Sequence, residues 1–94
     1  MSTSSSTSAT LNPVKKTYPK YRVILHNDDH NEMGYVLSSL MEVVAGLSEQ
    51  AAYYIMYSAH TSGKATVIVC DLEPAEFYCE SLKSKGLSSS LEKE

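Results

Sequence analysis

The spacing of the apolar residues changes where an Asn-Asp-Asp-His-Asn run crosses residues 27–31, and this change constrains the fold more than any other feature. Before the run, residues 21–26 (Tyr-Arg-Val-Ile-Leu-His) alternate as in a strand, which places Ile24 on the face opposite to Val23. After it, apolar residues recur every three or four positions from Met33 to Val44, as on an amphipathic helix. The polar run between them favours a turn, because Asn and Asp side chains bond to nearby backbone groups.

A second helix is predicted directly after the first. Asn31 is the predicted N-cap of the first helix, and Gly46 ends it. Ser48 can cap the second helix, whose apolar face runs to an end near Gly63. Because the loop between them is only about three residues long, the two helices must pack against each other as a hairpin.

The C-terminal part of the chain adds a strand, a helix and a short strand. Residues 65–70 (Ala-Thr-Val-Ile-Val-Cys) are rich in β-branched residues and nearly all apolar, which predicts a central strand. Asp71 can cap a third helix that has Pro74 in its first turn, and Gly86 ends it. Residues 87–91 can form a short closing strand. The predicted order is β-α-α-β-α-β, an α+β fold in which a small sheet packs with helices.

Composition excludes several classes of function. Eight of the first ten residues are Ser or Thr, so residues 1–20 are predicted to be a flexible N-terminal tail and residues 21–94 one folded domain. The net charge of −3 gives a nucleic-acid role no basic surface. No apolar stretch approaches the length of a membrane span. We therefore expect a protein of the cytoplasm without nucleic-acid or membrane partners. We also expect a monomer, and the plastid stroma as its location if the source is a plant.

Catalytic and metal sites have little support in the sequence. Cys70 and Cys79 lack a C-x-x-C spacing, and both fall on elements predicted to be buried. A small hydrolase that uses one of them with a histidine is therefore disfavoured, because a nucleophilic thiol needs an electropositive setting. A metal site from His26, Asp28 and His30 rests only on alternation at a strand end. We expect no enzyme activity, no metal and no cofactor.

Hydrogen-bond acceptors and apolar side chains are predicted to meet beside the polar run. A protonated α-amine has three donors and needs acceptors, preferably charged ones. Four side chains can supply them, namely Asn27, Asp28, Asp29 and, when neutral, His60. They suit a ligand with one positive charge next to a large apolar group. The free N-terminus of a peptide that begins with a bulky residue is such a ligand.

An apolar wall can complete this site. Met56 and His60 are four residues apart and so lie on one face of the second helix, and Met33 and Leu37 are related in the same way on the first. The predicted wall consists of Met33, Val36, Leu37, Met56 and Ala59. Each piece also has a structural interpretation, because methionines and a lone histidine on an apolar stripe are ordinarily core residues.

Four segments carry motifs that occur together. They are Tyr-Arg-Val-Ile-Leu-His-Asn-Asp-Asp at 21–29, Met-x-Tyr-Val at 33–36, Ile-Met-x-x-Ala-His-x-x-Gly-Lys at 55–64, and a tail from Leu87 to Leu91-Glu-Lys. In these motifs the chain resembles the ClpS family, the adaptors that deliver N-degron substrates to Clp-type AAA+ unfoldases. Compared with the best-known bacterial members, the chain has one more residue between the two predicted helices, around Ala45-Gly46. In this feature it resembles the plant and cyanobacterial forms. The resemblance implies a three-stranded antiparallel sheet packed with three helices.

The resemblance also implies roles for individual residues. It implies α-amine binding by Asn27, Asp28 and His60, and a gate at Met33 that excludes β-branched first residues. It implies pocket walls at Val36, Met56, Ala59 and Leu87, with Asp29 at the rim. Ala59 is smaller than the family's usual Val, which should widen or deepen the pocket. On the unfoldase-docking surface, Glu73 matches an acidic residue and Tyr78 replaces a basic one.

The sequence therefore predicts a non-enzymatic adaptor. It would bind the free α-amine and bulky apolar first residue (Phe, Leu, Tyr or Trp) of N-degron proteins and deliver them to a Clp unfoldase of the ClpA or ClpC type. The alternative is an interaction scaffold of the same fold, of the type of the ribosomal stalk C-terminal domain. Such a scaffold would ignore free amines and would not need Asn27, Asp28 and His60 together.

Overall fold

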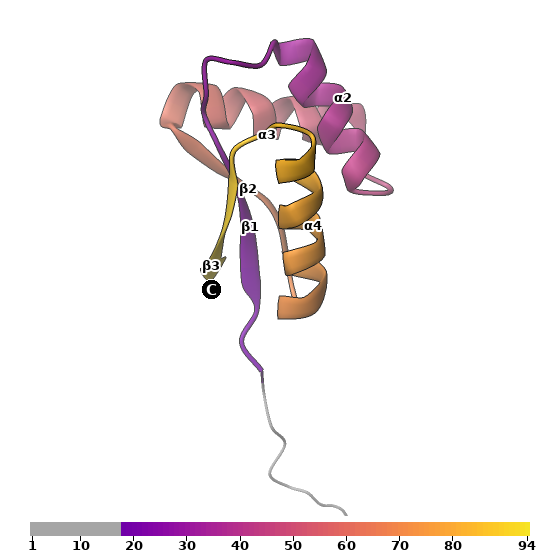
Figure 1. Cartoon of the computed structure of the whole chain (residues 1–94), viewed down its shortest axis with the longest axis vertical. Helices are drawn as coiled ribbons and strands as arrows, with labels where there is room; N and C mark the ends of the chain where they lie inside the picture. The colour runs from indigo at the N-terminus through magenta and orange to yellow at the C-terminus, as the bar shows by residue number, and fades with distance from the viewer. Residues whose placement is uncertain (1–17) are drawn as a thin grey trace, which may run out of the picture.

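Residues 18–94 are described by a computed structural model, so most of the predicted tail lies outside the described residues (Figure 1). At the start of this range the Lys20 carbonyl accepts a hydrogen bond from the Glu94 amide at 2.8 Å, and the Lys20 ammonium pairs with Asp71 at 2.7 Å. The division at residue 20 stays a prediction. Between residues 18 and 94, no helix is long and apolar enough to cross a bilayer.

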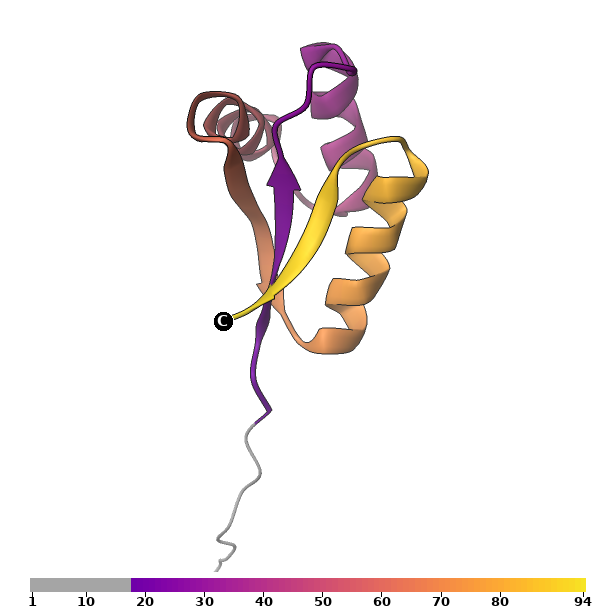
Figure 2. The same ribbon diagram turned by 60° about the vertical axis from the view of Figure 1, so that its left-hand side comes forward.

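Three helices and three strands follow one another in the predicted order. They are β1 (Tyr21–His26), α2 (Met33–Val43), α3 (Glu49–Ser62), β2 (Lys64–Cys70), α4 (Leu72–Ser84) and β3 (Ser89–Lys93). The strands form one antiparallel sheet with the order β2-β1-β3. In both views α4 runs alongside the strands, whereas α2 and α3 lie at the end of the sheet where β1 ends (Figures 1 and 2). The prediction of an α+β fold with a three-stranded antiparallel sheet is confirmed.

One continuous core joins all six elements. Val23 and Leu25 from the central strand pack in it with Leu40 of α2, Ala52 of α3 and Leu82 of α4, each at most 2% exposed. Ile24 is also 2% exposed but does not belong to this cluster, in keeping with its predicted place on the other face of β1. The central strand therefore buries residues on both faces, and it holds the loop that follows it at a fixed place beside α2 and α3.

The central position in the sheet belongs to β1, so the prediction of a central strand at residues 65–70 is wrong. In the structure β2 is an edge strand, and Val69 is 41% exposed. Its pairing with β1 shifts register between Val23 and Ile24, as at a β-bulge. A β-branched composition indicates a pleated and partly buried surface, which an edge strand also offers, so it could not decide the position.

Three predicted boundaries also differ from the structure. The N-cap of α2 is Glu32 rather than Asn31, because the Asn31 side chain is hydrogen-bonded elsewhere. The loop between α2 and α3 covers residues 44–48 and is longer than predicted. The last strand begins at Ser89 rather than at Leu87, because the Leu87 amide still bonds to the Leu82 carbonyl at 3.1 Å and so completes the end of α4. Ser48 caps α3 as predicted, accepting from the Ala51 amide at 3.1 Å.

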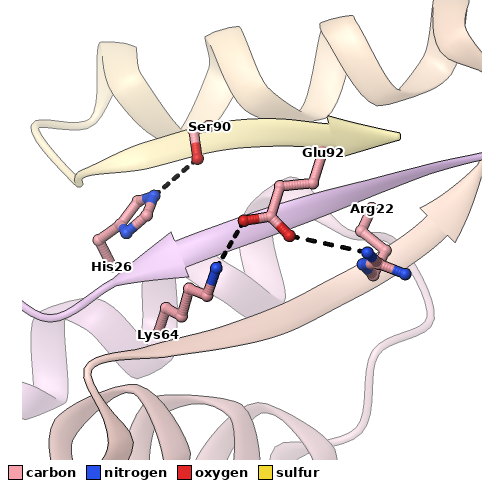
Figure 3. A network of polar contacts seen from close by, with 5 residues as sticks. All are labelled: Arg22, His26, Lys64, Ser90 and Glu92. Atoms are coloured by element: carbon pink, nitrogen blue, oxygen red, sulfur yellow. Dashed lines mark hydrogen bonds and ion pairs between the residues drawn. The ribbon is translucent and has the colours of Figure 1, made fainter. Parts of the chain in front are cut away.

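A polar network crosses all three strands on the face of the sheet that carries Ile24 (Figure 3). Glu92 of β3 accepts from the Lys64 ammonium at 2.7 Å and pairs with Arg22 at 3.7 Å. His26 Nε2 lies 2.6 Å from the Ser90 hydroxyl. The hydrogen bond from Lys64, together with the positive charges of Lys64 and Arg22, lowers the pKa of Glu92.

We expect Glu92→Gln to lower stability slightly at neutral pH and not at all in strong acid. A carboxyl whose pKa is lowered on folding stabilises the protein above its unfolded-state pKa, and this contribution is lost as the pH falls through the folded-state value. The effect is small because solvent reaches part of the Glu92 side chain and screens its ion pairs. Urea unfolding of both proteins at several pH values tests this: a gap between the two curves that widens in acid would contradict it.

Candidate functional site

A pocket of about 200 Å³ lies between the end of β1, the loop after it, the start of α2 and the C-terminal half of α3. Its lining residues are Leu25, His26, Asn27, Asp28, Asp29, Asn31, Met33, Val36, Met56, Ala59 and His60. Pockets for drug-sized ligands usually measure roughly 300–1,000 Å³. The smaller space here suits a single side chain with one polar group attached.

Asp28 organises the loop on the polar side of the pocket. Its Oδ1 accepts hydrogen bonds from the amides of His30 at 2.9 Å and Asn31 at 3.1 Å. Within residues 18–94, Oδ2 has one hydrogen bond, a long contact of 3.4 Å with Asn31 Nδ2. A carboxylate oxygen can accept two hydrogen bonds. Oδ1 therefore fixes the loop, while Oδ2 keeps capacity for a donor that enters the pocket.

Asn31 connects this loop to a distant part of the chain. Its Nδ2 donates to the Gly86 carbonyl at 3.0 Å, and one turn of helix later the Tyr35 hydroxyl donates to the Lys85 carbonyl at 2.6 Å. Both acceptors belong to the turn between α4 and β3. The sequence predicts Asn31 as a helix cap and not as a pocket residue. Its contact with Gly86 joins residues 55 positions apart, and no local sequence signal indicates such a contact.

We expect Asn31→Ala to destabilise the protein by about 0.5–1.5 kcal/mol, the net contribution of an ordinary hydrogen bond, because the exposed Gly86 carbonyl loses this donor. The variant should also bind ligands in the pocket more weakly, since Asp28 loses a partner. Urea unfolding measures the first effect, with Asn31→Asp as a variant that keeps the size of the side chain but not its donor. An unchanged unfolding midpoint in both variants would remove this role from Asn31.

Asn27 and His60 are held near each other through the end of α3. The Asn27 amide donates to the Gly63 carbonyl at 2.9 Å, and Gly63, with φ at 95°, is the C-cap of α3. His60 is exposed in the last turn of the same helix. Its imidazole makes no hydrogen bond to any other residue between 18 and 94. Both ring nitrogens are therefore available to a ligand.

The opposite side of the pocket is apolar. Met56 and Ala59 of α3 are 6% and 3% exposed and form its inner surface. Val36 of α2 is half-buried. Met33 is the first residue of α2 and is 45% exposed, which places it at the mouth. The pocket thus has acceptors at one side and a deep apolar surface at the other.

The structure brings together most, but not all, of the predicted pocket residues. Leu37 is half-buried against the core and Leu87 is 4% exposed within it, and neither lines the pocket. Leu25, His26 and Asn31 line it although they were not in the predicted set. His26 and Asn31 could have been suspected, because His26 directly precedes the polar run and Asn31 is its last residue. The binding roles of all these residues stay predictions.

The two predicted docking residues lie on α4, apart from the pocket. Glu73 is exposed in the first turn of this helix. Tyr78 is half-buried against the core and meets the ring of Phe77 edge-on, with centroids 5.8 Å apart. Glu73 is therefore accessible to a partner, whereas only part of Tyr78 is.

Residues 18–94 contain no arrangement that fits either of the two alternatives, a cysteine nucleophile or a metal site. Burial and the neighbouring Asp71 raise the pKa of the Cys70 thiol, the opposite of what a nucleophile needs, and Cys79 is 4% exposed. Among residues 18–94, no three His, Cys, Asp or Glu side chains converge as a metal-binding group. His26 is instead engaged with Ser90.

Comparison with known proteins gives consistent matches. Residues 16–90 match the family model described as "ATP-dependent Clp protease adaptor protein ClpS". The ClpS adapter of Synechococcus sp. (strain CC9902) is 59% identical over 81 residues, which are 86% of this chain and 78% of the relative. The chloroplastic adapter CLPS1 of Arabidopsis thaliana is 48% identical over 82 residues, or 87% of this chain and 52% of the relative.

A solved structure is similar over most of the chain. The structure of Agrobacterium tumefaciens ClpS2 bound to L-phenylalaninamide matches with a TM-score of 0.75 and 32% identity. The match covers 83% of this chain and all of the other. L-Phenylalaninamide carries a free α-amine, a benzyl side chain and an amide, the same groups as the first residue of a peptide.

Proposed function

The chain belongs to the ClpS family of Clp protease adaptor proteins, and from this premise we propose that its pocket binds the first residue of N-degron proteins. The observation that supports this most strongly is the two-sided pocket, with acceptors on the loop after β1 and a buried apolar surface on α3. The relatives that match are named adaptors, which supports a role in binding rather than in catalysis.

The polar side suits a protonated α-amine. An ammonium group has three donors, and charged partners give the strongest hydrogen bonds. In our proposal these donors go to the side-chain oxygen of Asn27, to Oδ2 of Asp28 and to one ring nitrogen of neutral His60. Asp29 contributes further negative charge at the rim. A ligand bound by the related ClpS2 has the same α-amine next to an aromatic side chain.

The apolar side suits the first side chain. Burial of an aromatic or branched aliphatic side chain against Met56, Ala59 and Val36 would contribute about 1.5–3 kcal/mol. The small Ala59 leaves more space than a Val would, so Phe, Leu, Tyr and Trp are the proposed first residues. Leu37 and Leu87 do not line the pocket, but they belong to the same hydrophobic core as Met56 and Ala59, and we propose that they support the walls from there.

We expect Met33→Ala to admit peptides that begin with Ile or Val. In our proposal Met33 stands over the mouth of the pocket and crowds a branch at Cβ of the first residue. Fluorescence anisotropy with labelled peptides that differ only in the first residue measures this, with Met41→Ala as a control: Met41 is on the same helix and 38% exposed but does not line the pocket. Continued rejection of Ile and Val by Met33→Ala would place the gate elsewhere.

Delivery to the protease is the second part of the proposal. A monomeric adaptor would dock on a Clp unfoldase of the ClpA or ClpC type through Glu73 and the exposed part of Tyr78, on a surface apart from the pocket. It would act where this protease acts, in the cytoplasm or, in a plant cell, in the plastid stroma. The cyanobacterial and chloroplastic relatives are compatible with either location.

A degradation assay tests delivery. A reporter protein with a free N-terminal Phe is incubated with unfoldase, peptidase and ATP, with and without this chain, and a reporter that begins with Met is the control. We expect the chain to accelerate loss of the Phe reporter only, and Glu73→Ala to remove most of the acceleration. Equal loss of both reporters with and without the chain would contradict the delivery role.

A further inference from the structure

Three tyrosines on α3 are exposed although no function considered so far uses them. Tyr53, Tyr54 and Tyr57 are 54%, 72% and 50% exposed. The rings of Tyr53 and Tyr57 are stacked, with centroids 6.2 Å apart and an angle of 11° between the planes. Aromatic side chains gathered on a surface are typical of binding sites.

The helical geometry separates two of these tyrosines from the third. Tyr53 precedes His60 by seven residues, so the two point in directions only about 20° apart around the helix axis. Tyr57 differs from His60 by about 60°, and Tyr54 by about 120°. The stacked pair therefore lies closer to His60 around the helix than Tyr54, which is turned about 60° beyond Tyr57.

The distances along the helix match the reach of a bound peptide. Tyr57 and Tyr53 precede His60 by roughly 4.5 and 10.5 Å along the axis, at 1.5 Å per residue. An extended chain spans about 3.3–3.6 Å per residue. A peptide whose α-amine is held beside His60 and whose chain runs along α3 would bring its second to fourth residues over the two rings.

Charge indicates what those residues should be. The face of a tyrosine ring attracts cations. Glu49 and Gln50 share a hollow with Tyr53 at the start of α3, and this helix contains no Lys or Arg. An Arg or Lys side chain could lie on the rings and approach the Glu49 carboxylate, whereas an acidic side chain would find no partner on this helix face except His60.

We propose that Tyr53 and Tyr57 form a second recognition surface, which favours Arg or Lys at the second to fourth residues of the N-degron. The inference rests on the proposed function, because it requires the first residue to occupy the pocket. It makes the chain selective for more than the first residue of its substrates.

Anisotropy with three labelled peptides of equal length tests the inference. Each begins with Phe, and positions two to four are Arg and Lys, Gly and Ser, or Asp and Glu. We expect the basic peptide to bind roughly fivefold more tightly than the neutral one, as one or two exposed cation–π contacts would give. Tyr53→Ala with Tyr57→Ala should bring this ratio close to one. Phe replacements should keep it, because the ring and not the hydroxyl makes the contact.

Tyr54→Ala is the matched control, because it removes an exposed tyrosine of the same helix that lies farther from His60 around the helix axis than Tyr53 and Tyr57 do. It should keep the ratio of the wild-type protein. A preference for basic residues that survives both Ala replacements would belong to the net negative charge of the chain and would overturn the inference. Equal binding of the three peptides would overturn it as well. Failure of every free-amine peptide to bind would contradict the proposed function and, with it, this inference.

Discussion

Asp28→Asn is expected to weaken binding of a peptide with a free N-terminal Phe by about 2–5 kcal/mol, the cost of removing one partner of a hydrogen-bonded charge pair. In affinity this is a loss of roughly thirtyfold to several thousandfold. The substitution removes the negative charge that we propose faces the α-ammonium. It keeps an oxygen that can accept from the amides of His30 and Asn31, so the loop retains its shape.

Asp28→Ala separates the two roles of this side chain. It removes the acceptor for the His30 and Asn31 amides as well as the charge, so it should lower stability in addition to affinity. Urea unfolding and peptide anisotropy of both variants therefore distinguish loop organisation from amine binding. If Asp28→Asn bound the peptide as tightly as the wild-type protein, the carboxylate would have no part in amine binding.

His60→Ala is expected to weaken binding of the same peptide by about 1.5–3 kcal/mol, the range for a hydrogen bond to a charged group. The imidazole has no hydrogen-bond partner between residues 18 and 94, so its removal breaks no hydrogen bond of the free protein. Stability should therefore change little, which is the mark of a residue that acts on the ligand. Thr61→Ala, a change of the neighbouring side chain on the same helix that does not line the pocket, is the control.

The role of His60 also has a pH signature. Only neutral imidazole can accept from an ammonium, and a protonated ring would repel it. Peptide affinity of the wild-type protein should therefore fall in acid, and the fall should be much weaker in His60→Ala. The same pH dependence in both proteins would assign it to another group.

The periodic segments of the chain could be predicted and the edges of the site could not. The strand at 21–26 and the stripes of α2, α3 and α4 follow from local spacing, because each buries one face in a shared core. Ser48 can be predicted as a cap from sequence, because its bond to Ala51 spans only three residues. Asn31 was not placed correctly, because its partner Gly86 is distant in sequence and only the folded chain brings them together.

The same limit applies to the pocket. Met33, Met56 and His60 could be grouped because helical spacing puts them on faces that a hairpin would bring together. Leu87 could not be placed in this way. The family resemblance implies that it lines the pocket wall, but it does not show how deeply the side chain is buried, and the structure buries Leu87 in the core. The stacked Tyr53 and Tyr57 drew no functional interpretation from sequence, since their relation to His60 becomes meaningful only once the pocket is located.

The most direct test of the central claim is a comparison of two labelled peptides that begin with Phe and differ only in acetylation of the α-amine. Anisotropy is measured against wild-type protein at neutral pH, with a free-amine peptide that begins with Gly as a control for nonspecific binding. The account predicts tight binding of the free-amine Phe peptide, and loss of that binding both on acetylation and with Gly. Equal binding of the free and acetylated Phe peptides would contradict it, because the pocket would then recognise the side chain without the amine.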